Sequence, residues 1–248
     1  MDIVGGAWNA NGHLEDFNMS LILNGKDGSS VEITIPEHYK KVAVNCSGGA
    51  DSSLLLYILA KYIKDNALDV KLSVLTCGAD SKYRWSGERA GSVVNYVIKN
   101  IGSGIIDMHY IYFRDEQDVK YFHEIEGDLL ADGRAQLIAS GITSNPPPGE
   151  SVEDIEGISN DLRKYAMADR IGAEHKTWHI STEGKGDFWN PFANVNKKFI
   201  ADQYDAYNLR STLLPLTRSC ETYALSGDPS PCGKCWWCLE RKWAFGYF

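Results

Sequence analysis

The chain has 248 residues, of which 44% are hydrophobic, and a formal net charge of −8. No apolar run approaches the roughly 20 residues of a membrane span, and the N-terminus lacks the basic start and apolar core of a secretory signal, so we expect a cytoplasmic protein with no membrane partner. The acidic charge removes the non-specific attraction that nucleic-acid-binding proteins rely on, which makes nucleic acid an unexpected partner.

Residues 1–40 are expected to form an N-terminal β-hairpin extension. Residues 21–23 and 31–35 are short strand-like runs, and the residues between them are rich in turn formers. Pro36 then ends the second run, because proline cannot continue a paired strand.

From residue 41 onward, predicted strands and helices alternate. Strands are expected at residues 41–46, 70–76, 108–113 and 135–142, and helices at residues 52–66, 88–100 and 119–132. This alternation predicts an α/β fold, in which a doubly wound, Rossmann-like parallel sheet has helices on both faces. We assign residues 41–190 to this domain, with a loop at 145–149 and an irregular stretch at 184–196. Residues 191–248 form the C-terminal segment, which opens with a helix at 197–207.

A glycine loop, Ser47–Ser53, lies between the first of these strands and its helix. Two adjacent glycines permit close approach by a ligand, and the first turn of a helix presents unpaired N–H groups and the positive end of its dipole. Such a loop is suited to phosphate, with Asp51 holding Mg²⁺; the alternative is a plain turn in which Asp51 or a serine caps the helix. The candidate nucleotide-binding residues are Ser47, Gly48, Gly49, Asp51, Ser52 and Ser53.

Four of the six cysteines gather near the C-terminus: Cys220, Cys232, Cys235 and Cys238. Pairs separated by two residues can turn toward one ion, and four thiolates suit a structural tetrahedral Zn²⁺. Cysteines at these gaps also hold iron–sulfur clusters, which is the alternative. Cys46 and Cys77 are expected to be packed thiols.

The string Ser-Gly-Gly-Ala-Asp-Ser after a hydrophobic strand resembles the signature of the PP-loop (N-type) ATP pyrophosphatases, whose fold is that of the adenine-nucleotide α-hydrolases. Together with the cysteine cluster, it resembles the 7-cyano-7-deazaguanine (preQ0) synthase family of queuosine biosynthesis. That resemblance implies a cytoplasmic ATP-dependent ligase, which adenylates 7-carboxy-7-deazaguanine, releases pyrophosphate and uses ammonia to form the amide and then the nitrile. The implied cofactors are ATP, Mg²⁺ and Zn²⁺. The implied catalytic residues are Asp51, Ser52, Lys197 and Lys198, one lysine neutralising the pyrophosphate.

The sequence departs from this family in the segments that would recognise the 7-deazaguanine substrate. Residues 77–81 and 144–149 differ from the family's substrate segments, and the hairpin is an addition. The ATP chemistry therefore carries over better than the substrate. A ligase for another carboxylate, a tRNA-modifying enzyme and a non-catalytic nucleotide-binding component remain alternatives, and a homodimer is left open.

Overall fold

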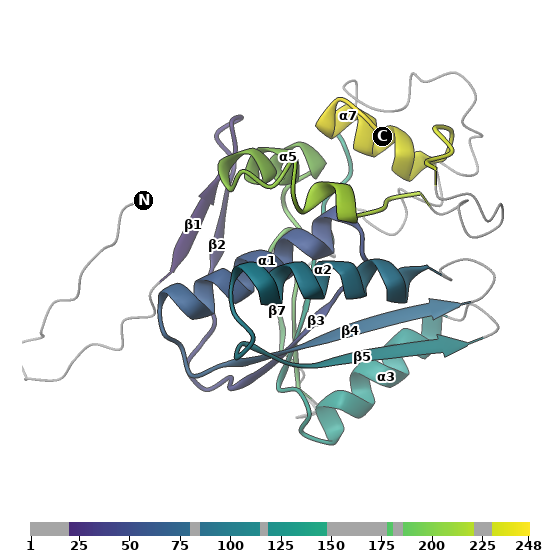
Figure 1. The fold of residues 1–248 in the computed structure, drawn as a ribbon. Coiled ribbons are helices and arrows are strands. Elements are labelled where there is room, and N and C mark those ends of the chain that lie inside the picture. Colours follow the sequence, from purple (N-terminus) through teal and green to yellow (C-terminus); the bar gives the residue numbers. More distant parts are fainter. Residues whose placement is uncertain (1–19, 80–84, 115–118, 148–177, 181–185, 221–229) are drawn as a thin grey trace, which may run out of the picture.

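The computed structural model describes residues 20–79, 85–114, 119–147, 178–180, 186–220 and 230–248 (Figure 1). Its centre is a six-stranded sheet in the order β5-β4-β3-β6-β8-β7. The strands are β3 (Lys41–Asn45), β4 (Lys71–Ala79), β5 (Ile106–Arg114), β6 (Leu137–Ser140), β7 (Trp178–Ile180) and β8 (Asp187–Trp189). All neighbours pair in parallel except β7, which runs antiparallel to β8.

The order of the strands reverses at β3. The chain moves outward from β3 to β4 and β5, then returns to place β6 on the other side of β3. In open α/β sheets, ligands bind beside the carboxyl ends of the strands at such a reversal. The loops that follow β3 and β6 therefore occupy the position where this fold holds ligands.

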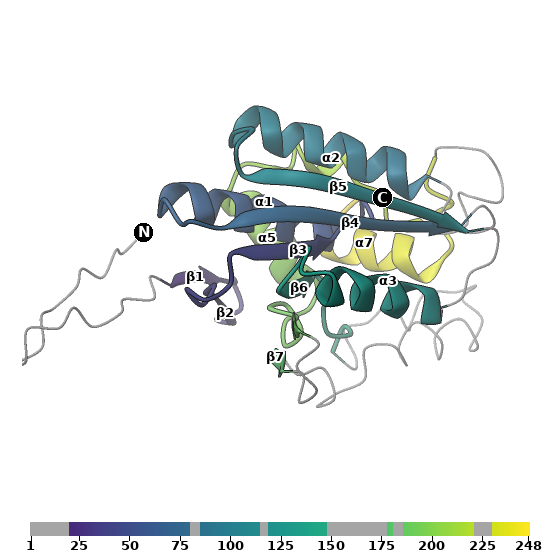
Figure 2. The same cartoon turned by 90° about the horizontal axis from the view of Figure 1, so that it is seen from below.

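Helices cover both faces of the sheet (Figures 1 and 2). The helices α1 (Ala50–Asp65) and α2 (Ser86–Asn100) lie on one face, and α3 (Val119–Ala131) lies on the other. Two apolar clusters follow this division, because Leu137 belongs to the α1 and α2 cluster, whereas its neighbour Ile138 packs with Leu129 of α3. The predicted doubly wound parallel sheet is confirmed.

The C-terminal segment adds a further helical layer over α1. It contains α5 (Lys197–Ala206), a 3₁₀ turn η3 (Leu214–Leu216) and α7 (Trp236–Phe245). Leu54, Leu55 and Leu56 of α1 are all fully buried, which a helix in contact with the sheet alone would not achieve. Among the helices that the structure describes, none is long and apolar enough to cross a membrane.

The N-terminal hairpin packs against α5. Its strands β1 (Leu21–Asn24) and β2 (Ser30–Ile33) pair antiparallel, and Ile33 belongs to the same apolar cluster as α1. The side chain of Gln203 donates to the carbonyl oxygen of Asn24 at 2.8 Å. The hairpin is thus part of the main core; residues 1–19 of the expected extension lie outside the described residues.

Two parts of the fold differ from expectation. The stretch expected to be irregular, residues 184–196, includes β8, because Asp187–Trp189 pairs with β6 and buries Trp189 to 1% exposure. The second is α7: no helix was predicted after residue 207, yet this one forms and buries Phe245 against the ring of Tyr204, while Tyr247 and Phe248 are exposed.

Gly141, directly after β6, is predicted to be indispensable for the packing of β6 against the start of α1. A Cβ atom there would lie 2.8 Å from the backbone nitrogen of Ser52, which cannot move alone. Gly141→Ala should therefore lower the free energy of unfolding by about 1–3 kcal/mol. Gly91→Ala in α2 is the matched control, since no atom lies within 4 Å of its added methyl group. Urea unfolding that leaves both variants equally stable would contradict the packing argument.

Candidate functional site: the loop after β3 and the cysteine cluster

The glycine loop joins the central strand β3 to α1. Gly48 has a φ of +78°, a left-handed conformation that favours glycine, and Gly49 is the N-cap of α1. No side chain caps this helix start. The first N–H groups of α1 therefore face the loop, together with the positive end of the helix dipole, in an arrangement suited to an anion.

Neighbouring segments hold the loop closely on two sides. A Cβ atom at Gly48 would lie 2.5 Å from the Cβ of Arg89 at the start of α2. On the other side, the backbone N–H of Arg218 donates to the carbonyl oxygen of Gly48 at 2.8 Å. The second helix and the segment before the cysteine cluster thus fix the path of the loop.

The three serines of the loop differ in their access to a ligand. The hydroxyl oxygens of Ser47 and Ser52 lie 3.4 Å apart at the loop surface. Ser53 is fully buried inside α1. The structure therefore brings the first two together, whereas the predicted contact from Ser53 would have to come from its backbone N–H.

A buried lysine connects the loop to both C-terminal helices. The ammonium nitrogen of Lys197 lies 3.1 Å from Oδ2 of Asp51 and 2.9 Å from Oε2 of Glu240. The side chain of Lys197 is 3% exposed, that of Glu240 is 0% exposed and that of Asp51 is 17% exposed. The three charges form a cluster in which only Asp51 is partly exposed.

Lys198 lies elsewhere. Its backbone N–H donates to the side chain of Asn196, which caps α5, and its ammonium group lies 4.6 Å from the centre of the Trp243 ring. Of the two lysines predicted to contact pyrophosphate, the structure brings only Lys197 to the loop.

Two further buried side chains attach the C-terminal helices to the loop region. The hydroxyl of Tyr204 donates to the carbonyl oxygen of Ala50 at 2.9 Å, and burial raises the pKa of this phenol so that it stays neutral. Arg241 donates to the hydroxyl of Thr217 at 2.9 Å and to the carbonyl oxygen of Leu214 at 3.1 Å. Burial lowers the pKa of Arg241.

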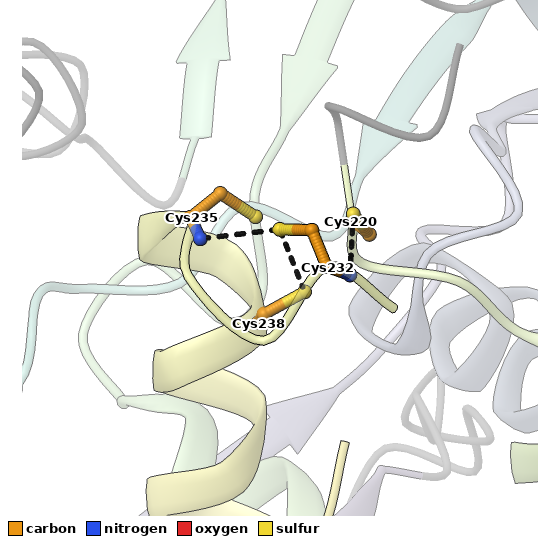
Figure 3. Close-up of side chains that lie close together, drawn as sticks. All are labelled: Cys220, Cys232, Cys235 and Cys238. Atoms are coloured by element: carbon orange, nitrogen blue, oxygen red, sulfur yellow. Dashed lines mark hydrogen bonds between the residues drawn. The ribbon is translucent and has the colours of Figure 1, made fainter. Parts of the chain in front are cut away.

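The four C-terminal cysteines converge at the start of α7 (Figure 3). Their sulfur atoms all lie within 4.8 Å of one another, and those of Cys232 and Cys238 are 3.9 Å apart. Four thiolates at about 2.3 Å from one tetrahedral ion would lie about 3.8 Å apart. A four-iron cluster would hold each thiolate on a different iron and so spread the sulfurs more widely. The spacing therefore fits a single metal ion.

The backbone supports thiolates at this position. Gly233 has a φ of +67°, which lets the chain turn so that the N–H groups of Lys234 and Cys235 donate to the sulfur of Cys232 at 3.4 and 3.3 Å. Cys235 is the N-cap of α7, where the helix dipole favours a negative sulfur.

The thiols need a cation to ionise together. The neighbouring Cys220 and burial raise the pKa of Cys235 to about 12. Cys220 and Cys235 likewise raise the pKa of Cys238. A metal ion reverses this effect because it binds the deprotonated form.

Cys46 and Cys77 form no second cluster. They belong to the apolar clusters on opposite faces of the sheet, and both are buried free thiols. Burial raises the pKa of Cys46, and burial together with Glu126 raises that of Cys77 to about 12. Both are packed thiols, as expected.

Three buried polar residues, Glu240, Arg241 and Tyr204, were not predicted as part of the site. Glu240 and Arg241 follow the last cysteine in α7, a helix that was not predicted, whereas Tyr204 lies in the predicted helix α5.

No protein-family model matches the sequence, and no curated protein matches it. Among solved structures, the chain is similar to the U34-tRNA thiolase NcsA from Methanococcus maripaludis, a structure with a [4Fe-4S] cluster, with a TM-score of 0.44, 14% identity and coverage of 91% of this chain and 74% of that one. It is also similar to the NMN synthetase from Francisella tularensis (TM-score 0.40, 12% identity, 85% and 79% coverage). A third is the NAD⁺ synthetase from Burkholderia pseudomallei (TM-score 0.32, 16% identity, 85% and 75% coverage). The fold assignment rests on the strand order described above.

The cysteine cluster predicts one bound metal ion per chain. Cys235→Ser should lose that ion and lower the melting temperature, because a structural metal contributes several kcal/mol to folding. Elemental analysis and thermal unfolding measure both effects. Cys77→Ser is the control: it changes a buried thiol outside the cluster and should keep the metal. Unchanged metal content in Cys235→Ser would contradict the assignment.

Proposed function

We propose that this chain is a PP-loop enzyme that uses ATP to adenylate a carboxylate and then amidates it, as 7-cyano-7-deazaguanine synthases do. One observation carries the proposal: the Ser47–Ser53 loop lies at the strand reversal, on the carboxyl end of the central strand, and opens a helix that no side chain caps. An uncapped helix start at this position suits the phosphates of a nucleotide.

Different groups of the loop would bind the phosphates of ATP and the Mg²⁺ ion. The first N–H groups of α1 and the hydroxyls of Ser47 and Ser52 would bind the β- and γ-phosphates. The partly exposed carboxylate of Asp51 would hold Mg²⁺, which neutralises the charge that builds on the departing pyrophosphate. Lys197 keeps the carboxylate of Asp51 oriented and adds positive charge behind the loop.

The chemistry follows from the poor reactivity of a carboxylate. An oxygen of the substrate carboxylate attacks the α-phosphorus of ATP, the bond between the α-phosphorus and the bridging oxygen breaks, and pyrophosphate leaves. Ammonia then attacks the acyl carbon, AMP leaves with the former carboxylate oxygen, and an amide remains. A second adenylation, on the amide oxygen, lets AMP leave again and gives the nitrile after loss of two protons.

The cysteine cluster would hold Zn²⁺ in a structural role. Four thiolates close the coordination shell and leave no position for substrate. Such an ion would fix the start of α7, the helix that carries Glu240.

The two cysteines outside the C-terminal cluster, Cys46 and Cys77, do not suit a thiolating enzyme. Sulfur transfer calls for accessible, reactive thiols, yet Cys46 and Cys77 are buried, face opposite sides of the sheet and have raised pKa values. The rival substrate is instead another carboxylate, because residues 77–81 and 144–149 differ from the family's substrate segments. Of these, residues 80–81 and 148–149 lie outside the described residues.

The substrate is tested by product formation. Incubation with ATP, Mg²⁺, ammonium and 7-carboxy-7-deazaguanine should release AMP and pyrophosphate only when the acid is present, with the nitrile visible by mass spectrometry. Release with a different acid would keep the ligase class and overturn the deazaguanine substrate. Absence of release with every acid, in protein that binds ATP, would favour a non-catalytic nucleotide-binding component.

Asp51→Asn should reduce pyrophosphate release at least about a hundredfold, since it removes the charge that would hold Mg²⁺ while keeping the size of the side chain. Lys198→Ala removes a charge that faces Trp243 and should leave the rate near that of the wild type. Stopped assays of pyrophosphate measure both. Equal rates in Asp51→Asn and the wild type would refute the role given to the loop.

A further inference from the structure

Glu240 is a fully buried carboxylate on α7, two residues after the last cysteine. Its Oε2 lies 2.9 Å from the ammonium nitrogen of Lys197, which also lies 3.1 Å from Asp51. Lys197 is therefore shared between a carboxylate that faces the loop and one that is enclosed by the core.

A shared lysine makes the two carboxylates interdependent. A buried charge is costly without a partner, so Glu240 holds Lys197 in place, and the two carboxylates compete for one ammonium group. If Glu240 lost its charge, the pairing of Lys197 with Asp51 would strengthen, and the carboxylate of Asp51 would be less available to another cation.

We propose that Glu240 is a positioning residue for the nucleotide site, which acts through Lys197 to keep Asp51 available to a divalent cation. The proposal rests on the function proposed above, in which Asp51 holds Mg²⁺. Glu240 is fixed for this task because α7 begins within the cysteine cluster and because Arg241, the next residue, binds Leu214 and Thr217.

The sign of the effect distinguishes positioning from a purely structural role. Neutralising Glu240 strengthens the pairing of Lys197 with Asp51 and removes negative charge behind the loop, and both changes weaken the binding of a cation. The same loss of negative charge strengthens the binding of an anion. A variant that merely loosened the fold would weaken the binding of both.

The test uses Glu240→Gln, which keeps the size of the side chain, beside Glu37→Gln, an exposed carboxylate that precedes β3, whereas the loop follows the other end of that strand. Two quantities are measured in the full-length protein: the free Mg²⁺ concentration that gives half the maximal pyrophosphate release at fixed Mg-ATP, and the affinity for inorganic pyrophosphate without Mg²⁺ by calorimetry. In Glu240→Gln we expect the free Mg²⁺ concentration for half-maximal release to rise about three- to tenfold, which is the effect expected of one charge at a partly exposed site. We also expect pyrophosphate to bind more tightly. Glu37→Gln should match the wild type in both.

The outcomes are separable. Weaker binding of both ligands, or no change in either, would overturn the proposal. If Glu240→Gln folds poorly, Glu240→Asp keeps the buried charge but retracts it from Lys197, and should shift the Mg²⁺ requirement in the same direction by less. If the wild type binds pyrophosphate but does not cleave ATP with any of the acids tested, the proposed function fails. Tighter pyrophosphate binding by Glu240→Gln still decides in that case whether Glu240 acts on the loop.

Discussion

Burying an ammonium group is costly unless carboxylates pair with it, and the arrangement of the loop region follows from this constraint on Lys197. Asp51 comes from the start of α1, Lys197 from the start of α5 and Glu240 from the middle of α7. The three helices must therefore meet at one place. The hydrogen bond from Tyr204 to Ala50 and the bonds of Arg241 to the segment before Cys220 fasten the same helices from either side.

The two candidate centres are joined by α7. Its first turn contributes Cys235 and Cys238 to the thiol cluster, and its next turn contributes Glu240 to the charge cluster. In Figure 1, α5 and α7 lie together on the side of α1 that faces away from the sheet. The segment from Thr217 to Cys220 completes the connection, because Arg218 bonds to Gly48 of the loop. A metal ion at the cysteines would thus stabilise the same helical layer that contacts the Ser47–Ser53 loop.

Local sequence predicted the features that depend on local chemistry. The loop at Ser47–Ser53, the alternation of strands and helices, and the four converging cysteines each depend on residues close together in the chain, or on a spacing that one ion can recognise. What escaped prediction depends on distant partners. The strand at Asp187–Trp189 forms because β6 offers it an edge, and the buried ion pair of Glu240 exists only because Lys197 lies opposite. Lys197 and Lys198 were indistinguishable in sequence, since the difference between them is which side of α5 faces the core.

The charge cluster also has a consequence for how the protein is made. The strands β3, β4 and β5 are neighbours both in the chain and in the sheet, and all three are synthesised long before α7. Asp51 is among the first residues of this part of the chain to emerge, whereas Glu240 is synthesised long after it. The Ser47–Ser53 loop is therefore synthesised well before the C-terminal helices that pack beside it. Ribosome-bound chains that stop short of residue 240 would lack the buried carboxylate that pairs with Lys197, which confines the complete charge cluster to chains that have received α7.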